Sequence, residues 1–445
     1  MGVVTASFGY RAEQLIQALR PARPRQYGTL TRIVGLTLEA QGVSAPVGAI
    51  CRILKEDQDY VDAQVVGFDS GIVYLMPLWQ ATGLSPGAKV YLHSESDSAD
   101  VGDQLLGRIV NAVGEPLDGG EEITTEKRMG LMGSVPNPME REPIDTILDV
   151  GVKAINSVLT IGCGQRIGLI AGSGVGKSVL LGMLTKFTSA DVVVIGLIGE
   201  RGREVKEFIE NPLGEEGRAK AVVVAAPADE SPLLRLRATH LAHLYAEHFR
   251  GQGKSVLLLV DSLTRVAHAQ REIGLAVGEP PTAKGYPPSV FSLLPKLIER
   301  SGTGRRGQGA ITAIYTLLAE GDDLNDPIVD LARASLDGQV VLSRALADAA
   351  HYPAIDLMGS ISRLMPLIGD SDGIRAANTF RRLWTLYQQN QDLINVGAYE
   401  AGANPDLDKA IVLRSAMEQF LQQDMHESVS YAEAVQAMQE CLGGG

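Results

Sequence analysis

The chain is poor in cysteine. Cys51, Cys163 and Cys441 are the three cysteines among 445 residues, and they lie far apart without a Cys-x-x-Cys pair. This spacing argues against a disulfide framework and against a zinc site. We therefore expect a cytoplasmic protein that works in a reducing compartment.

Long apolar runs are also missing. No stretch approaches the roughly 18 consecutive apolar residues that indicate a membrane span. Near the N-terminus, Arg11, Glu13 and Arg20 interrupt any signal-peptide hydrophobic region. We expect neither a transmembrane segment nor a secretion leader.

Positive charge is in short supply. The sequence has 40 Lys and Arg residues against 53 Asp and Glu residues, which gives a formal net charge of −13. Broad binding to a nucleic-acid backbone needs clustered Lys and Arg. The balance therefore predicts no nucleic-acid partner, although it leaves room for a local basic channel.

The length allows about three domains. Residues 1–25 combine a short apolar stripe with a basic, proline-containing end. They would contact a partner or an anionic membrane surface, or would be a solvated terminus. Residues 26–93 carry short apolar runs split by turn residues, which predicts a small sheet or β-barrel. Residues 94–377 alternate strand and helix patterns, and residues 378–445 are mostly helical.

The alternation in the middle of the chain predicts an α/β domain with a mostly parallel sheet covered on both faces. Ligands in such sheets bind beyond the carboxyl ends of the strands. The predicted strands are 166–170, 192–198, 221–225, 255–260, 309–315 and 339–342.

A phosphate-binding loop follows the first of these strands. Residues 171–178 read Ala-Gly-Ser-Gly-Val-Gly-Lys-Ser, with Ala171 where the usual pattern has Gly. Glycines let several backbone N–H groups point at one anion, and the following helix N-terminus favours negative charge. Lys177 can reach the outer phosphates, and the Ser178 hydroxyl can bind magnesium. The segment predicts nucleotide binding.

Two later strands end in acidic residues. Asp261 closes the apolar run 256–260, where it could hold magnesium directly or through water. Glu200, Arg201 and Glu204 follow the strand 192–198. Glu200 could orient and deprotonate a water molecule, and Arg201 could contact the γ-phosphate. Charged loops at strand ends are common, so spacing alone does not settle these roles.

Two further residues have two interpretations each. Arg344 follows a strand, and it could neutralise transition-state charge on a neighbouring subunit's nucleotide or form a surface salt bridge. Tyr352 could stack on a base or be half-buried. His240, His243 and Glu247 share one side of a predicted helix. Their spacing fits no zinc pattern, so we interpret that side as a solvated helix face.

Several motifs in a fixed order resemble the rotary-type ATPases, and most closely the type III secretion ATPases, with the flagellar branch favoured. The resemblance covers nearly the whole chain. The motifs that carry it are residues 162–166, 172–178, 199–205, 225–229, 261–265, 278–288, 320–328, 351–356 and 359–363.

The resemblance implies an N-terminal β-barrel, a central RecA-like P-loop ATPase domain and a C-terminal helical domain. It also implies residue roles. Nucleotide binding would involve Gly172, Ser173, Gly174, Val175, Gly176, Lys177, Ser178, Val179 and Tyr352. Catalysis would involve Lys177, Glu200, Arg201, Arg265 and Arg344, with Arg344 supplied in trans. The metal would involve Ser178, Asp261 and Glu204. Tyr399 would close over the base.

The resemblance further implies ATP and Mg²⁺ as ligands and a homohexameric ring with nucleotide at the subunit interfaces. Residues 278–288 would face the central hole and meet a coiled-coil stalk protein. A regulatory or stator protein would bind the N-terminal segment, and chaperone–substrate complexes would be further partners. The implied function is ATP hydrolysis that energises protein export, at the cytoplasmic side of the inner-membrane export apparatus.

Other functions fit parts of the sequence. A virulence-type secretion ATPase shares most motifs. An ATP synthase catalytic subunit tends to carry Thr where this chain has Gly202. An RNA translocase would conflict with the acidic balance, and a noncatalytic ring subunit would lack Glu200.

Overall fold

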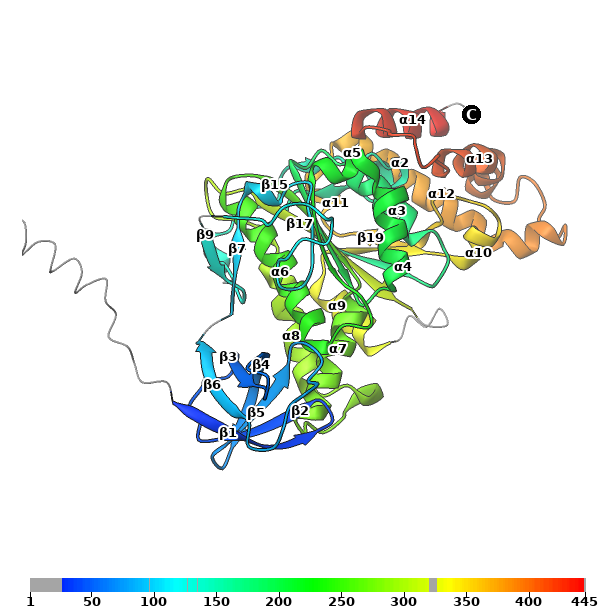
Figure 1. Ribbon diagram of the computed structural model, residues 1–445. Coiled ribbons are helices and arrows are strands. Elements are labelled where there is room, and N and C mark those ends of the chain that lie inside the picture. The colour runs from blue at the N-terminus through cyan, green and yellow to red at the C-terminus, as the bar shows by residue number, and fades with distance from the viewer. Residues whose placement is uncertain (1–25, 96, 126, 134, 320–325, 444–445) are drawn as a thin grey trace, which may run out of the picture. The chain divides into compact units, whose positions relative to one another are not determined.

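The computed structural model describes residues 26–443 except 96, 126, 134 and 320–325 (Figure 1). The chain divides into two compact units, residues 1–96 and 97–445. The predicted contact segment 1–25 lies outside the described residues, so its helix and its partners stay predictions. Among the described residues, no helix combines the length and the apolar character that crossing a membrane requires.

The first unit contains a closed barrel of six antiparallel strands in the order β1-β2-β5-β4-β3-β6. Along β4, Val61, Ala63 and Val65 are buried and alternate with more exposed neighbours, as a strand with one face toward a core requires. The predicted β-barrel is confirmed. Its strands are β1 (Tyr27–Val34), β2 (Thr37–Gln41), β3 (Ile50–Leu54), β4 (Tyr60–Asp69), β5 (Ile72–Pro77) and β6 (Lys89–Ser94).

The second unit is built on a sheet in the order β19-β18-β12-β17-β15-β13-β14-β8, with β16 paired to β17. β19 and β16 run antiparallel to their neighbours, and the other pairs are parallel. The strands are β8 (Ile109–Val110), β12 (Arg166–Ala171), β13 (Val192–Ile198), β14 (Ala221–Ala226), β15 (Ser255–Asp261), β16 (Gly302–Thr303), β17 (Ala310–Leu318), β18 (Gly338–Leu342) and β19 (Ile355–Ser362).

Two small antiparallel pairs accompany this sheet. They are β7 (Ser98–Val101) with β9 (Lys127–Gly130), and β10 (Ile147–Leu148) with β11 (Ile161–Gly162). The six strands predicted for this part of the chain are all present, within one to three residues at their ends. Buried apolar runs between turn residues fix these strands locally.

Helices cover both faces of the sheet. Alternate residues of β13, such as Val193 and Ile195, join one core with Leu181 of α3. On the opposite face, a Cβ atom at Gly196 would lie 3.3 Å from Cβ of Ala242 in α6. The helices of this part are α2 (Lys153–Val158), α3 (Lys177–Phe187), α4 (Gly202–Phe208), α5 (Gly214–Ala219), α6 (Pro232–Gly251), α7 (Leu263–Ala276), α8 (Pro288–Arg300), α9 (Pro327–Ser335), α10 (Arg344–Asp348) and α11 (Met365–Ile368).

Short helical turns complete this part: 3₁₀ turns η1 (Asp103–Leu105), η2 (Pro138–Glu140) and η4 (Ala283–Gly285), and a π-turn η3 (Ile209–Leu213).

The C-terminal part is helical, as predicted. It consists of α12 (Ser371–Asn395), α13 (Pro405–Leu421) and α14 (Tyr431–Gly443). The rings of Phe380 in α12 and Phe420 in α13 lie 5.3 Å apart, and both belong to the core that includes the sheet. α12 begins at Ser371 and runs across the domain boundary expected at residue 377. The helical part is therefore continuous with the α/β part in a shared core.

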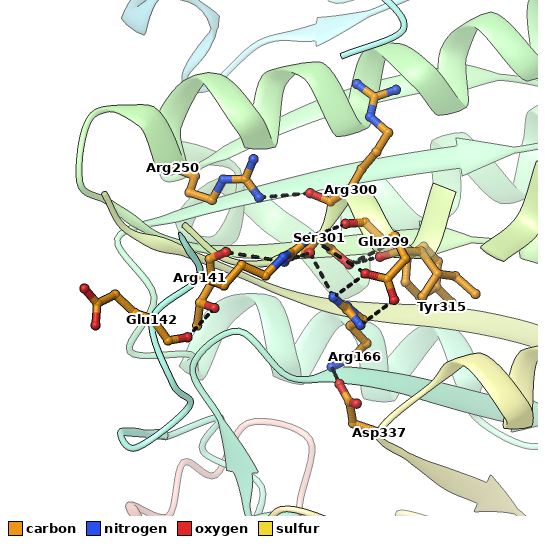
Figure 2. A network of polar contacts seen from close by, with 11 residues as sticks. Arg141, Glu142, Arg166, Arg250, Glu299, Arg300, Ser301, Tyr315 and Asp337 are labelled. Atoms are coloured by element: carbon orange, nitrogen blue, oxygen red, sulfur yellow. Dashed lines mark hydrogen bonds and ion pairs between the residues drawn. The ribbon is translucent and has the colours of Figure 1, made fainter. Parts of the chain in front are cut away.

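A network of charged groups ties together the ends of several elements at the amino ends of β12 and β17 (Figure 2). The guanidinium of Arg166, at the start of β12, makes two 3.0 Å hydrogen bonds with Glu299 near the end of α8. The backbone N–H of Arg166 donates to the carboxylate of Asp337. Arg141 donates to the carbonyl of Ser301 at 2.8 Å. These bonds anchor α8 at the edge of the sheet opposite the carboxyl ends of the strands.

The prediction of a solvated face on α6 is wrong. His243 is 1% exposed and Glu247 is 8% exposed. Glu247 forms a two-pronged ion pair with Arg300, at 2.7 and 3.0 Å, and Nδ1 of His240 lies 3.0 Å from Nη1 of the same arginine. Nε2 of His243 lies 3.0 Å from the hydroxyl of Tyr315 on β17. The polar side chains point at partners from distant strands and helices, which helical spacing cannot reveal.

Candidate active site

The phosphate loop joins β12 to α3 at the carboxyl edge of the sheet. Gly174 and Gly176 have φ values of +78° and +90°, a backbone region that residues with a side chain rarely adopt. A Cβ atom at Gly176 would also lie 3.4 Å from the ring of Tyr352. The loop curls back toward the first turn of α3, where unpaired N–H groups favour an anion.

The loop lines a cavity of about 1080 Å³. Of the predicted nucleotide-binding residues, those on its wall are Gly172, Ser173, Gly174, Gly176, Lys177, Ser178 and Val179. Val175 and Tyr352 do not line the cavity. The side chain of Val175 is 1% exposed and packs in the core. Any contact from Val175 to a phosphate would therefore come from its backbone N–H.

Lys177 bridges two carboxylates from neighbouring strands. Its Nζ lies 2.5 Å from Oδ1 of Asp261, at the end of β15, and 3.5 Å from Oε1 of Glu200, beyond β13. Burial lowers the pKa of Lys177, but the Asp261 and Glu200 charges outweigh it, and the pKa is raised overall. The lysine is therefore held fully charged beside the loop.

Glu200 has a raised pKa. Burial is the largest cause and the charge of Asp261 adds to it, while Lys177 and Arg265 oppose the shift. A carboxyl group with a raised pKa accepts a proton more readily than an ordinary one. This is the property that a general base for water needs.

Three more predicted residues surround Glu200 at the cavity wall: Arg201, Glu204 and Arg265. Arg201 pairs with Glu204 at 3.2 Å, and its side chain is 73% exposed. Arg265 is more enclosed, because its Cβ packs 2.8 Å from the position of a Cβ at Gly199. Nε of Arg265 is buried without a hydrogen-bond partner.

The side chain of Arg344 contacts the phosphate loop of its own chain. Its Nη2 donates to the carbonyl oxygen of Ser173 at 3.2 Å, and its side chain lines the same cavity. We expected this arginine to serve a neighbouring subunit's nucleotide. β18 ends at the same sheet edge as β12 and carries Arg344 to the loop of the same chain, which favours a role in cis. The role in trans stays a prediction.

The two tyrosines differ in position. Tyr352 packs on Gly176 and is 45% exposed, so one side of its ring borders the loop and part of it is open. Tyr399 does not line the cavity. Its hydroxyl bonds instead with Asn404 and with Asp408, at 3.0 and 2.9 Å, in the connection between α12 and α13. Its closure over a base stays a prediction.

Sequence reasoning missed other residues at the cavity wall and directly behind it. Arg235 in α6 holds both carboxylate oxygens of Glu272 in α7, at 3.0 and 2.9 Å, and His268 lies on the same wall. Thr316 donates to Asp261 at 2.6 Å from the neighbouring strand. A threonine near the carboxyl end of an apolar strand was a usable signal for Thr316. No sequence signal pointed to the pair of Arg235 and Glu272, because the two residues are far apart in sequence.

The residues of the site fit Mg²⁺ and ATP. Mg²⁺ prefers oxygen ligands and is held by one or two protein groups together with substrate phosphates. The Ser178 hydroxyl and the Asp261 carboxylate supply such oxygens on one cavity wall. Within the described residues, no cluster of three or more His, Cys, Asp or Glu side chains could hold a metal by itself.

Two family models match the chain. Residues 151–362 match the nucleotide-binding domain of the ATP synthase alpha/beta family, and residues 370–440 match the T3SS EscN ATPase C-terminal domain. The flagellum-specific ATP synthase of Pseudomonas aeruginosa is 52% identical over 100% of both chains. The chain belongs to the family of flagellum-specific and type III secretion ATPases. It is an ATP-hydrolysing enzyme of that family.

Other members of the family agree in sequence and in fold. The flagellum-specific ATP synthase of Salmonella typhimurium is 53% identical over 95% of this chain and 94% of its own length. The assembled ATPase EscN of enteropathogenic E. coli superposes with a TM-score of 0.88 at 41% identity, over 93% of this chain and 100% of EscN. EscN in complex with its central stalk EscO gives a TM-score of 0.86 at 40% identity.

Proposed function

We propose that this ATPase hydrolyses Mg·ATP to energise protein export through a flagellar type III secretion apparatus. The flagellar branch is supported by 52% and 53% identity to flagellum-specific relatives, against 41% to the virulence-system ATPase EscN. The catalytic activity is supported most directly by one observation: Lys177 meets Glu200 and Asp261 beside a glycine-rich loop.

The residues divide the chemistry among them. Lys177 and the loop N–H groups bind phosphate oxygens. Ser178 and Asp261 would hold Mg²⁺, with Glu204 nearby. The metal supplies positive charge that neutralises the phosphates. Glu200 accepts a proton from the attacking water. Hydrolysis of this kind depends on positioning and charge stabilisation more than on covalent chemistry.

Arginines complete the site. Arg265 and Arg201 approach the γ-phosphate from the side of Glu200. Arg344 acts in cis, because its guanidinium already contacts the loop of its own chain. Tyr352 packs against the adenine. Any arginine that a neighbouring subunit inserts is then a different residue.

The working assembly in this proposal is a homohexameric ring with nucleotide at the subunit interfaces. EscN has been solved assembled and with its central stalk, and it resembles this chain closely. By this analogy, residues 278–288 face the central hole and contact a stalk protein. Chaperone–substrate complexes and a regulatory protein at residues 1–25 are further proposed partners. The ring would work in the cytoplasm, peripheral to the inner membrane.

Steady-state ATPase activity against protein concentration, with mass photometry on the same samples, tests this proposal. Specific activity that rises as hexamers form supports a ring enzyme. Activity that is absent at every concentration, with and without Mg²⁺, contradicts the proposed hydrolysis. Full activity in a monomer contradicts the proposed need for a ring.

A further inference from the structure

A buried hydroxyl stands beside the acidic end of β15. In the parallel pairing of β15 with β17, Val260 lies opposite Tyr315, so the next residues, Asp261 and Thr316, are neighbours at the carboxyl edge. Thr316 is 0% exposed. Its Oγ1 donates to Oδ1 of Asp261 at 2.6 Å, a distance expected for a hydroxyl bound to an ionised carboxylate.

The same carboxylate oxygen carries a second donor. Nζ of Lys177 lies 2.5 Å from Oδ1 of Asp261. In the described part of the chain, the hydrogen bonds and the ion pair of the Asp261 side chain all end on Oδ1. Its Oδ2 is therefore the oxygen left for a metal ion or a metal-bound water.

The two donors differ in what else they must do. Lys177 stands on a long, flexible side chain, and in the proposed function it turns toward the nucleotide phosphates. Thr316 is β-branched and enclosed in a strand, which restricts its side-chain rotamers. When Lys177 engages a phosphate, Thr316 is the donor that remains on Oδ1.

We propose that Thr316 is a positioning residue of the magnesium site, which holds Asp261 in the orientation that presents Oδ2 to Mg²⁺. This proposal rests on the proposed function. Thr316 itself touches neither nucleotide nor metal. Its effect is therefore expected on the coupling between metal and nucleotide, and not on nucleotide affinity in general.

The chain offers a matched control on the same strand. Thr312 is also 0% exposed, and its Oγ1 accepts a hydrogen bond from the N–H of Gly164 at 2.8 Å. It stands four positions before Thr316 in the sequence and lies toward the opposite end of β17. A Thr312→Val variant loses a buried hydroxyl of the same kind without touching the site.

The experiment measures the affinity of the full chain for a fluorescent ADP analogue with Mg²⁺ and with EDTA. The ratio of the two dissociation constants reports the metal's contribution to binding. Thr316→Val should reduce this ratio about tenfold, the size expected for a hydrogen bond to a charged group. Thr316→Ser should keep most of it, and Thr312→Val should keep the wild-type ratio. Melting temperatures measured in parallel show which variants fold.

The results for these variants either support the proposal or overturn it. A wild-type ratio in Thr316→Val overturns the proposal, and so does an equal reduction in Thr312→Val. If Thr316→Val does not fold, the comparison of Thr316→Ala with Thr316→Ser replaces it, and equal ratios in that pair overturn the proposal. Failure of the proposed function has a different signature, because the wild-type chain would then show no Mg²⁺ effect and no hydrolysis.

Discussion

Nη2 of Arg344 donates to the backbone carbonyl of Ser173, 3.2 Å away on the same chain. This contact ties the end of β18 to the phosphate loop that follows β12. It places a positive charge at the nucleotide cavity without help from a neighbouring subunit. Because of this contact, Arg344 could act in cis or in trans, and a complementation experiment with mixed subunits can separate the two modes.

Arg344→Ala should leave nucleotide binding nearly intact and reduce turnover by roughly 10²–10³-fold, because transition-state charge loses a preorganised donor. Steady-state kinetics and a nucleotide-binding titration check this expectation. Normal turnover in the variant would exclude the role.

Mixed rings then separate the two modes of action. Arg344→Ala subunits, which keep Glu200, are mixed with Glu200→Gln subunits, which keep Arg344. An arginine acting in cis leaves every site defective, so the mixture should show no gain over the separate variants. Recovery of activity on mixing would show that Arg344 serves a neighbour's site.

Glu200→Gln should bind ATP and hydrolyse it very slowly, because the amide cannot accept the proton from water. In the wild type, kcat/KM should fall as the pH drops through the raised pKa of Glu200, which lies above the ordinary value of 4.5. The sign follows from the need for the ionised carboxylate. Preserved hydrolysis in the variant, or an unchanged acidic limb in its residual activity, would assign the base elsewhere.

Tyr352→Ala should weaken ATP binding by roughly 2- to 10-fold, the range expected when an aromatic stacking partner is lost. Tyr352→Phe should bind like the wild type, because the ring stays and the hydroxyl makes only a 3.3 Å bond to Ala347. Titration with ATP and GTP checks both variants. Equal affinities for wild type and Tyr352→Ala would remove this residue from the base site.

Glu247→Ala should lower the free energy of unfolding by about 3–5 kcal/mol, because it leaves the buried charge of Arg300 without its partner. Glu210→Ala is the matched control, since it breaks an exposed i,i+4 pair with Lys206 and should cost about 0–1 kcal/mol. Urea denaturation of both variants measures the difference. Similar small losses in the two would show that the buried pair is not an important source of stability.

Stability should fall in mild acid because α6 buries neutral histidines. Burial, with the nearby charge of Arg300, lowers the pKa of His240 and of His243 from 6.5 to about 3. The unfolded chain therefore binds protons first as the pH drops. The two histidines make their full contribution to the free energy of unfolding above about pH 6.5. This contribution is lost as the pH falls toward 3, at up to about 1.4 kcal/mol per pH unit for each histidine.

The free energy of unfolding, measured by urea titration between about pH 7 and 5.5, checks this dependence. His243→Asn should flatten the curve, since it removes one of the two groups. A slope that the substitution leaves unchanged would assign the acid sensitivity to other residues.

The sequence by itself determined the features that depend on neighbours along the chain. The strands of the main sheet follow from buried apolar runs between turn residues. The phosphate loop follows from Gly174, Gly176 and Lys177 placed between a strand and a helix. Each of these features is encoded within about ten residues, where backbone conformation and hydrophobic periodicity act directly.

Only the tertiary structure decided which distant groups meet. Asp261 lies 84 residues from Lys177 in sequence and 55 from Thr316, yet parallel pairing brings all three to one sheet edge. Glu247 and Arg300 are also distant in sequence and meet only in the fold. Their ion pair lies on the side of α6 that was predicted to be solvated and is buried. Arg344 reached its own loop for the same reason. Strand order and helix packing set these contacts, and neither can be obtained from periodicity along a single segment.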